Sequence, residues 1–104
     1  MKTKIRQGQF EVIDSFAIRR RNEFYLIGKL TEGNVQENWF VNIPLNGSLA
    51  LTVRIKAIEY IEISSDTNLY TLLIVSCEER EDVDLLLGLK IGSEKLDITI
   101  EGLD

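Results

Sequence analysis

The sequence predicts an all-β protein, a small closed or nearly closed antiparallel β-barrel of six to seven strands. Short segments in which apolar and polar residues alternate recur along most of the 104 residues. Glycine, asparagine and proline stand between these segments, as they do in the turns of short hairpins. No segment has the spacing of a convincing amphipathic helix. Many short strands without helices bury one face of each strand by forming a sandwich or a barrel.

The first hairpin is predicted from two alternating segments and a basic turn. Residues 9–18 alternate as a strand whose apolar face carries Phe10, Val12, Phe16 and Ile18. Asp14 is a polar exception on this face and indicates a bend or bulge. Residues 19–21 are three arginines, and the apolar pattern restarts at Phe24. Asn22 suits a left-handed turn position. We therefore expect a hairpin with a solvated arginine tip.

The middle of the chain contains two further predicted strands. A turn at residues 32–34 precedes a strand at 39–44, which ends at a proline because proline cannot donate to a strand ladder. The Asn46-Gly47 pair is typical of a tight hairpin turn. A long strand begins at residue 49, and after Ala57 its apolar and polar residues no longer fall on opposite faces. This change predicts a β-bulge at residues 57–59.

The last part of the chain contains three predicted strands. Residues 70–77 form an apolar run that also fits a buried helix, but its short length and its β-branched residues favour a strand. Residues 83–91 alternate again and predict another strand. The final strand is expected at residues 96–100. The acidic residues between 78 and 84 are interpreted as a solvated loop rather than a cation site.

Length and composition place limits on the class of protein. A chain of 104 residues with 44% hydrophobic and 28% charged residues is typical of one globular domain. We expect a basic N-terminal arm at 1–9, a barrel domain at 10–101 and a tail at 102–104. The single cysteine, Cys77, excludes an intramolecular disulfide, and the polar first residues do not resemble a signal peptide. A cytoplasmic, non-membrane protein is therefore expected.

Charge is unevenly distributed along the chain. The net charge is −5, with +4 in residues 1–30 and −9 in residues 31–104. An acidic protein is poorly suited to broad contact with a phosphate backbone, although a local basic patch still acts over a Debye length of about 8–10 Å. Any contact with nucleic acid is therefore expected to be local.

No motif in the sequence predicts catalysis, a metal site or a cofactor. Histidine, the commonest general base and zinc ligand, is absent, and one cysteine cannot form a zinc site. Gly28 and Gly33 have the spacing of a phosphate-binding loop, but Asn34 and Val35 replace its lysine and hydroxyl residue. We expect no enzymatic activity, no nucleotide hydrolysis and no cofactor.

A set of apolar, glycine and turn residues has a characteristic spacing: Phe16-Ala17-Ile18, the arginine turn, Gly28, Gly33, Val35, Asn38 and Val41. Over about residues 10–91, the chain resembles the second-domain β-barrel of translational GTPases such as elongation factor Tu, without the GTPase domain. Asn38 stands where that family often has a third glycine. The arginine turn replaces a Gly-Arg-Gly turn and is one residue longer. The resemblance implies a translation-protein-like barrel and a local RNA contact.

Two functions follow as hypotheses. The first is a non-enzymatic binding module that docks on a protein partner or self-associates, because four apolar side chains lie opposite the main core face: Tyr25, Ile27, Phe40 and Leu86. Coverage by the ends of the chain itself is the alternative explanation. The second is an RNA- or ribosome-contacting accessory that uses Arg19, Arg20 and Arg21. An accessory role whose ligand the sequence does not identify remains open.

Overall fold

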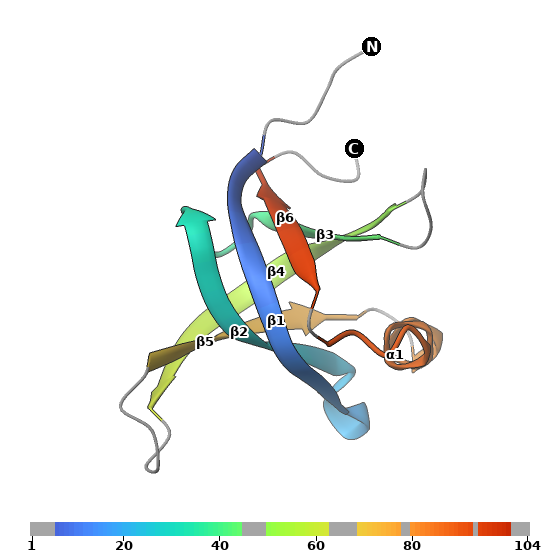
Figure 1. Cartoon of the computed structure of the whole chain (residues 1–104). Coiled ribbons are helices and arrows are strands. Elements are labelled where there is room, and N and C mark those ends of the chain that lie inside the picture. Colours follow the sequence, from blue (N-terminus) through green and yellow to red (C-terminus); the bar gives the residue numbers. More distant parts are fainter. Residues whose placement is uncertain (1–5, 45–49, 63–68, 78–79, 93, 101–104) are drawn as a thin grey trace.

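Six antiparallel strands form a closed barrel in the order β1-β2-β5-β4-β3-β6 (Figure 1). The computed structural model describes residues 6–44, 50–62, 69–77, 80–92 and 94–100. The strands are β1 (Arg6–Ile18), β2 (Glu23–Gly33), β3 (Phe40–Pro44), β4 (Ala50–Glu62), β5 (Leu69–Ser76) and β6 (Lys95–Thr99). A 3-10 turn, η1 (Arg19–Arg21), and a helix, α1 (Arg80–Gly88), complete the described elements. The predicted all-β barrel is confirmed.

The β1–β2 hairpin turns where the arginines and Asn22 predict it. Asn22 has a left-handed backbone (φ 51°), and its N–H donates to the carbonyl of Arg19 at 3.0 Å. In the middle of β2, Gly28 lies against the β1 backbone: a Cβ at this position would come within 1.9 Å of the Glu11 carbonyl oxygen. Glycine is therefore required at Gly28 for β1 and β2 to pair.

Bulges divide the two longest strands. In β1, the extra residue is Ile13, at the register shift between Val12 and Asp14, whereas the shift beside Gln9 and Phe10 leaves Thr31 of β2 unpaired. In β4, the shift lies between Ile55 and Ala57, slightly earlier than the predicted position. Each bulge adds an unpaired residue and exchanges the two faces of the strand that follows it.

The predicted strand at residues 83–91 is wrong, because α1 covers Arg80–Gly88. Val83 and Leu86 are three residues apart and fully buried, as one face of a helix requires, whereas Leu85 is 48% exposed. Acidic residues in the first turn complement the helix dipole. Figure 1 shows α1 beside the barrel, in the connection from β5 to β6.

The main core consists of side chains that point into the barrel, together with residues from α1 and the segment after it. Its members are Phe10, Val12, Phe24, Leu26, Val35, Val41, Ile43, Ile55, Leu73, Val75, Leu86, Ile91, Leu96 and Ile98. Burial of these apolar side chains is the main force that stabilises the barrel.

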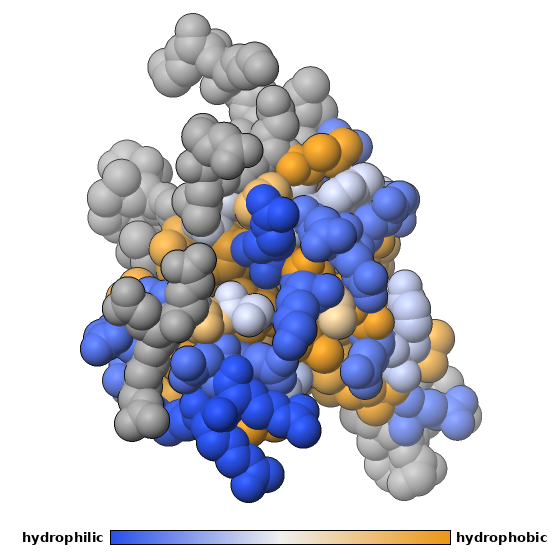
Figure 2. Space-filling model, turned by 180° about the vertical axis from the view of Figure 1, so that it is seen from behind, coloured by the Kyte–Doolittle hydropathy of each residue, from blue (hydrophilic) through white to orange (hydrophobic). Residues whose placement is uncertain are grey.

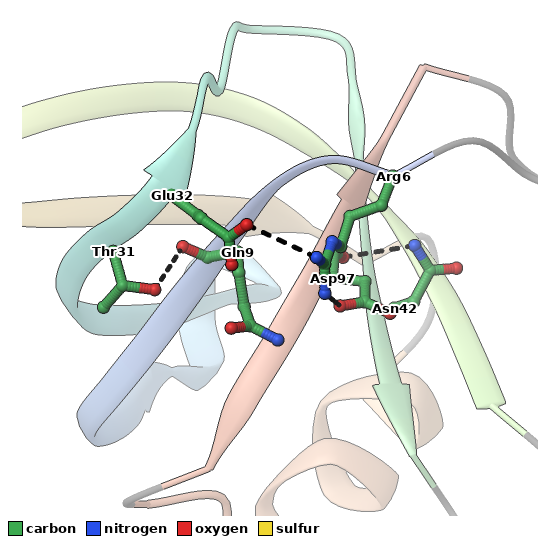
Figure 3. A network of polar contacts seen from close by, with 6 residues as sticks. All are labelled: Arg6, Gln9, Thr31, Glu32, Asn42 and Asp97. Carbon is green, nitrogen blue, oxygen red and sulfur yellow. Dashed lines mark hydrogen bonds and ion pairs between the residues drawn. The ribbon is translucent and has the colours of Figure 1, made fainter.

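A polar network crosses the outside of the barrel where β6 joins β1 and β3 (Figure 3). Arg6 lies between Glu32 of β2 at 3.4 Å and Asp97 of β6 at 3.7 Å. The side chain of Asn42 in β3 donates to the carbonyl of Asp97 at 3.2 Å. The barrel therefore begins at Arg6, within the predicted N-terminal arm. Residues 1–5 of that arm, the Asn46-Gly47 turn and the tail at 102–104 lie outside the described residues.

Candidate binding surfaces

The structure does not bring the four predicted interface residues together on one surface. Leu86 belongs to the main core and is 1% exposed. Phe40 is buried on β3, with the guanidinium of Arg54 4.8 Å from its ring centre. Tyr25 and Ile27 lie together on β2, in a small apolar cluster outside the main core. The four residues therefore divide into two pairs: Tyr25 and Ile27 share this outer cluster, whereas Phe40 and Leu86 line a hollow beside α1.

The surface that carries Tyr25 and Ile27, here called the Phe16 face, is the outer side of β1, β2, β5 and β4. The strand registers align one row of side chains across all four strands: Phe16, Tyr25, Ile74 and Ala57. The rings of Phe16 and Tyr25 stack at 4.9 Å with an angle of 7° between their planes. Tyr25 and Ile74 are buried, but Phe16 is 43% exposed. The Phe16 ring therefore presents apolar surface on the outside of a closed barrel.

Phe16 was predicted on the core side of the first strand, together with Phe10 and Val12, and this prediction is wrong. The extra residue between Val12 and Asp14 shifts the alternation, so that Asp14 and Phe16 point outward. The signal was present in the sequence, because Asp14 broke the apolar series. A bulge at this point exchanges the two faces of the residues that follow it, including Phe16.

A hollow of about 390 Å³ lies on the Phe16 face beside an ion pair. Its lining residues are Arg21, Glu23, Tyr25, Lys56, Ala57, Glu59, Leu72 and Ile74. Glu23 accepts hydrogen bonds from the Tyr25 hydroxyl at 2.5 Å and from the Lys56 ammonium at 2.6 Å. These two bonds, Lys56 first, lower the pKa of Glu23, whereas burial, followed by the bond to Glu23, raises the pKa of Tyr25. Glu23 is therefore an ionised carboxylate, and the ion pair organises one edge of the hollow.

The three arginines of η1 are exposed, but they do not form one uncompensated basic patch. Arg19 forms an ion pair with Asp84 of α1, and Arg21 lies 4.0 Å from the Glu23 carboxylate. Arg20 has no charged partner among the described residues. Seen from behind, strongly hydrophilic residues gather at the end of the molecule where the β1–β2 hairpin turns (Figure 2). The sequence could not show that carboxylates lie so close to two of the arginines.

A second and larger hollow, here called the α1 groove, lies between β4, the end of β5 and α1. Its volume is about 770 Å³. Its lining residues are Asn38, Phe40, Leu51, Thr52, Val53, Arg54, Lys56, Val75, Ser76, Cys77, Asp82, Leu85 and Leu86. Burial, followed by the charge of Asp82, raises the pKa of Cys77. Cys77 is therefore a neutral thiol in this groove rather than a reactive thiolate.

Neither hollow combines residues for a recognisable reaction. In the described part of the chain, no three Cys, Asp or Glu side chains form a group that could hold a metal ion. No helix among the described elements has the length and apolar character needed to cross a membrane. Comparisons with protein families, curated proteins and solved structures found no match. The two hollows and the exposed Phe16 ring are thus the basis for inferring a function.

Proposed function

We propose that this chain is a non-enzymatic binding module that docks on a protein through the Phe16 face, and that its partner is a second copy of the chain. The observation that carries the proposal is the exposed Phe16 ring beside a hollow whose floor includes Tyr25, Leu72 and Ile74. The interior of the barrel has its own buried core, so this outer apolar cluster is separate from it.

A second copy suits this surface because it carries both a projecting ring and a hollow. In a two-fold symmetric interface, a residue of one copy contacts a second residue of the partner, and the reverse contact forms as well. Such a pairing places the Phe16 ring of each copy against the hollow of the other. Aromatic side chains that become buried at the centre of an interface contribute much of its binding energy.

Light scattering after size-exclusion chromatography, over a series of concentrations, tests the proposal. We expect a mass above the 11.9 kDa of one chain, rising with concentration. Phe16→Ser should return the protein to a monomer. Leu85→Ser is the matched control, because Leu85 is similarly exposed at 48% but lies on α1. A wild-type protein that stays monomeric at every concentration would refute self-association.

Contact with RNA through η1 is the second proposal. It is supported by three exposed arginines in a single turn, of which Arg20 has no charged partner among the described residues. Asp84 and Glu23 oppose it, because they already neutralise part of the positive charge of Arg19 and Arg21. We therefore rank it below protein docking.

We also infer a relationship to the second-domain barrels of translational GTPases. It is supported by the closed six-strand barrel and by left-handed backbones at Gly33 (φ 68°) and Asn38 (φ 73°), two of the positions on which the resemblance rests. Asparagine tolerates this conformation better than most residues, so it can replace a glycine there. A cytoplasmic location belongs to the same proposal.

A further inference from the structure

We propose that the α1 groove binds a small amphipathic anion, an acyl or aryl chain that carries a carboxylate. This site lies on a different side of β4 from the Phe16 ring and shares Lys56 with the lining of the hollow on the Phe16 face. The volume of the groove, about 770 Å³, lies in the range of roughly 300–1,000 Å³ typical of small-molecule sites. Such sites also occur at the mouths of β-barrels, and they combine apolar walls with a few polar groups.

The floor of the groove is apolar because it reaches the main core. Val75 and Leu86 line the groove and are each 1% exposed, and Leu51 and Val53 pack against the same core. Leu85 of α1, at 48% exposed, forms part of the opposite wall. A narrow hydrocarbon or aryl chain can cover these side chains and remove their apolar surface from water.

Arg54 is the group that selects an anion. Its guanidinium lies over the ring of Phe40, and it has no carboxylate partner in the described part of the chain. A guanidinium that stacks on an aromatic ring keeps its N–H groups at the edge, where they can bind a carboxylate through two hydrogen bonds. Lys56 is bound to Glu23, so we assign the main role to Arg54.

Asp82 determines the orientation of the ligand. It lies on α1 and lines the groove together with Leu85. A carboxylate near Asp82 would be repelled, whereas a carboxylate on the β4 side meets Arg54. The apolar chain of the ligand is therefore expected beside α1, with its anionic head at β4.

Decanoate is a suitable probe, and the thiol of Cys77 reports on the groove. Cys77 is the only cysteine of the chain and lines the groove, so its alkylation by iodoacetamide can be followed on the full-length protein in alkaline solution, where the thiolate forms. We expect decanoate to slow this alkylation in a saturable manner. Decyltrimethylammonium, which has the same chain length and the opposite charge, should not. Equal protection by both amphiphiles would overturn the proposal.

Two variants that each remove one positive charge test whether Arg54 binds the carboxylate of decanoate. Arg54→Gln should weaken decanoate binding about tenfold or more, because hydrogen bonds between charged groups are lost. Arg20→Gln, at the exposed turn, should leave it unchanged, as should Phe16→Ser on the other face. Unchanged binding to Arg54→Gln would refute the assigned role. If an acidic, leucine-rich peptide protects Cys77 from alkylation and decanoate does not, the proposal of a small ligand is wrong and the groove binds a polypeptide.

Discussion

The ion pair of Glu23 with Lys56, at the edge of the hollow on the Phe16 face, should stabilise the folded protein, and a single substitution tests this. The substitution Glu23→Gln keeps the size of the side chain and removes the negative charge that Lys56 and Tyr25 bind. A hydrogen bond to a charged group stabilises a protein by about 1.5–3 kcal/mol, against about 0.5–1.5 kcal/mol for a neutral one. The Lys56 side chain is 55% exposed, so solvent screening reduces the difference. We expect a loss of about 1 kcal/mol in the free energy of unfolding at pH 7.

The loss of stability in Glu23→Gln should be present near neutral pH and disappear in acid. The pKa of Glu23 lies below its ordinary value of 4.5 in the folded protein. A carboxylate with a lowered pKa stabilises the fold above its unfolded pKa, and this contribution is lost as the pH falls through the folded pKa. The difference in stability between the wild type and Glu23→Gln should therefore be constant above about pH 5 and disappear in more acidic solution.

Urea denaturation at a series of pH values, followed by circular dichroism, measures this difference. Glu59→Gln is the matched control, because Glu59 is exposed and lines the same hollow. We expect Glu59→Gln to change stability by less than about 0.5 kcal/mol. Equal effects of the two substitutions, or a difference that grows as the pH falls, would refute the role assigned to the Glu23 ion pair.

Three further predictions concern the fold and the arginine turn. Gly28→Ala should prevent folding or destabilise the barrel by about 4 kcal/mol or more, because the Cβ of the alanine would meet the Glu11 carbonyl. An unchanged circular dichroism spectrum together with unchanged urea resistance would contradict this. Leu86→Ala should cost about 2–5 kcal/mol in urea unfolding and Leu85→Ala much less; a strand at residues 83–91 would reverse this order by burying Leu85. Replacement of residues 19–21 by alanine should abolish any salt-sensitive binding of structured RNA, and the absence of wild-type binding at low salt would refute the RNA proposal.

Local patterns predicted most of the strands because the apolar and polar faces of a β-strand alternate with a period of two. The predicted strand at residues 70–77 corresponds to β5, and Asn22 adopts the left-handed conformation expected of it. Residues 83–91 were mistaken for a strand because their leucines are so closely spaced that they fit both periods. The burial of Leu86 rather than Leu85 decides in favour of a helix, and it depends on packing against the core.

The candidate surfaces were less predictable than the strands. Tyr25 and Ile27 were identified correctly as lying outside the main core, but Phe40 and Leu86 are covered by the chain itself. The α1 groove is not predicted by the sequence, because its walls come from four elements, β3, β4, β5 and α1, whose relative positions depend on tertiary packing. No local periodicity reports which helix will lie against which strand.

The sequence by itself determined the class of fold and several turn conformations, because alternation and the special backbones of glycine and asparagine are local properties. Only the tertiary structure decided which side chains reach the surface. The bulge after Val12 turned Phe16 outward, and the packing of α1 placed Asp84 against Arg19, 65 residues away. Such outcomes depend on how strands register and how distant elements pack, and neither is a property of any single segment.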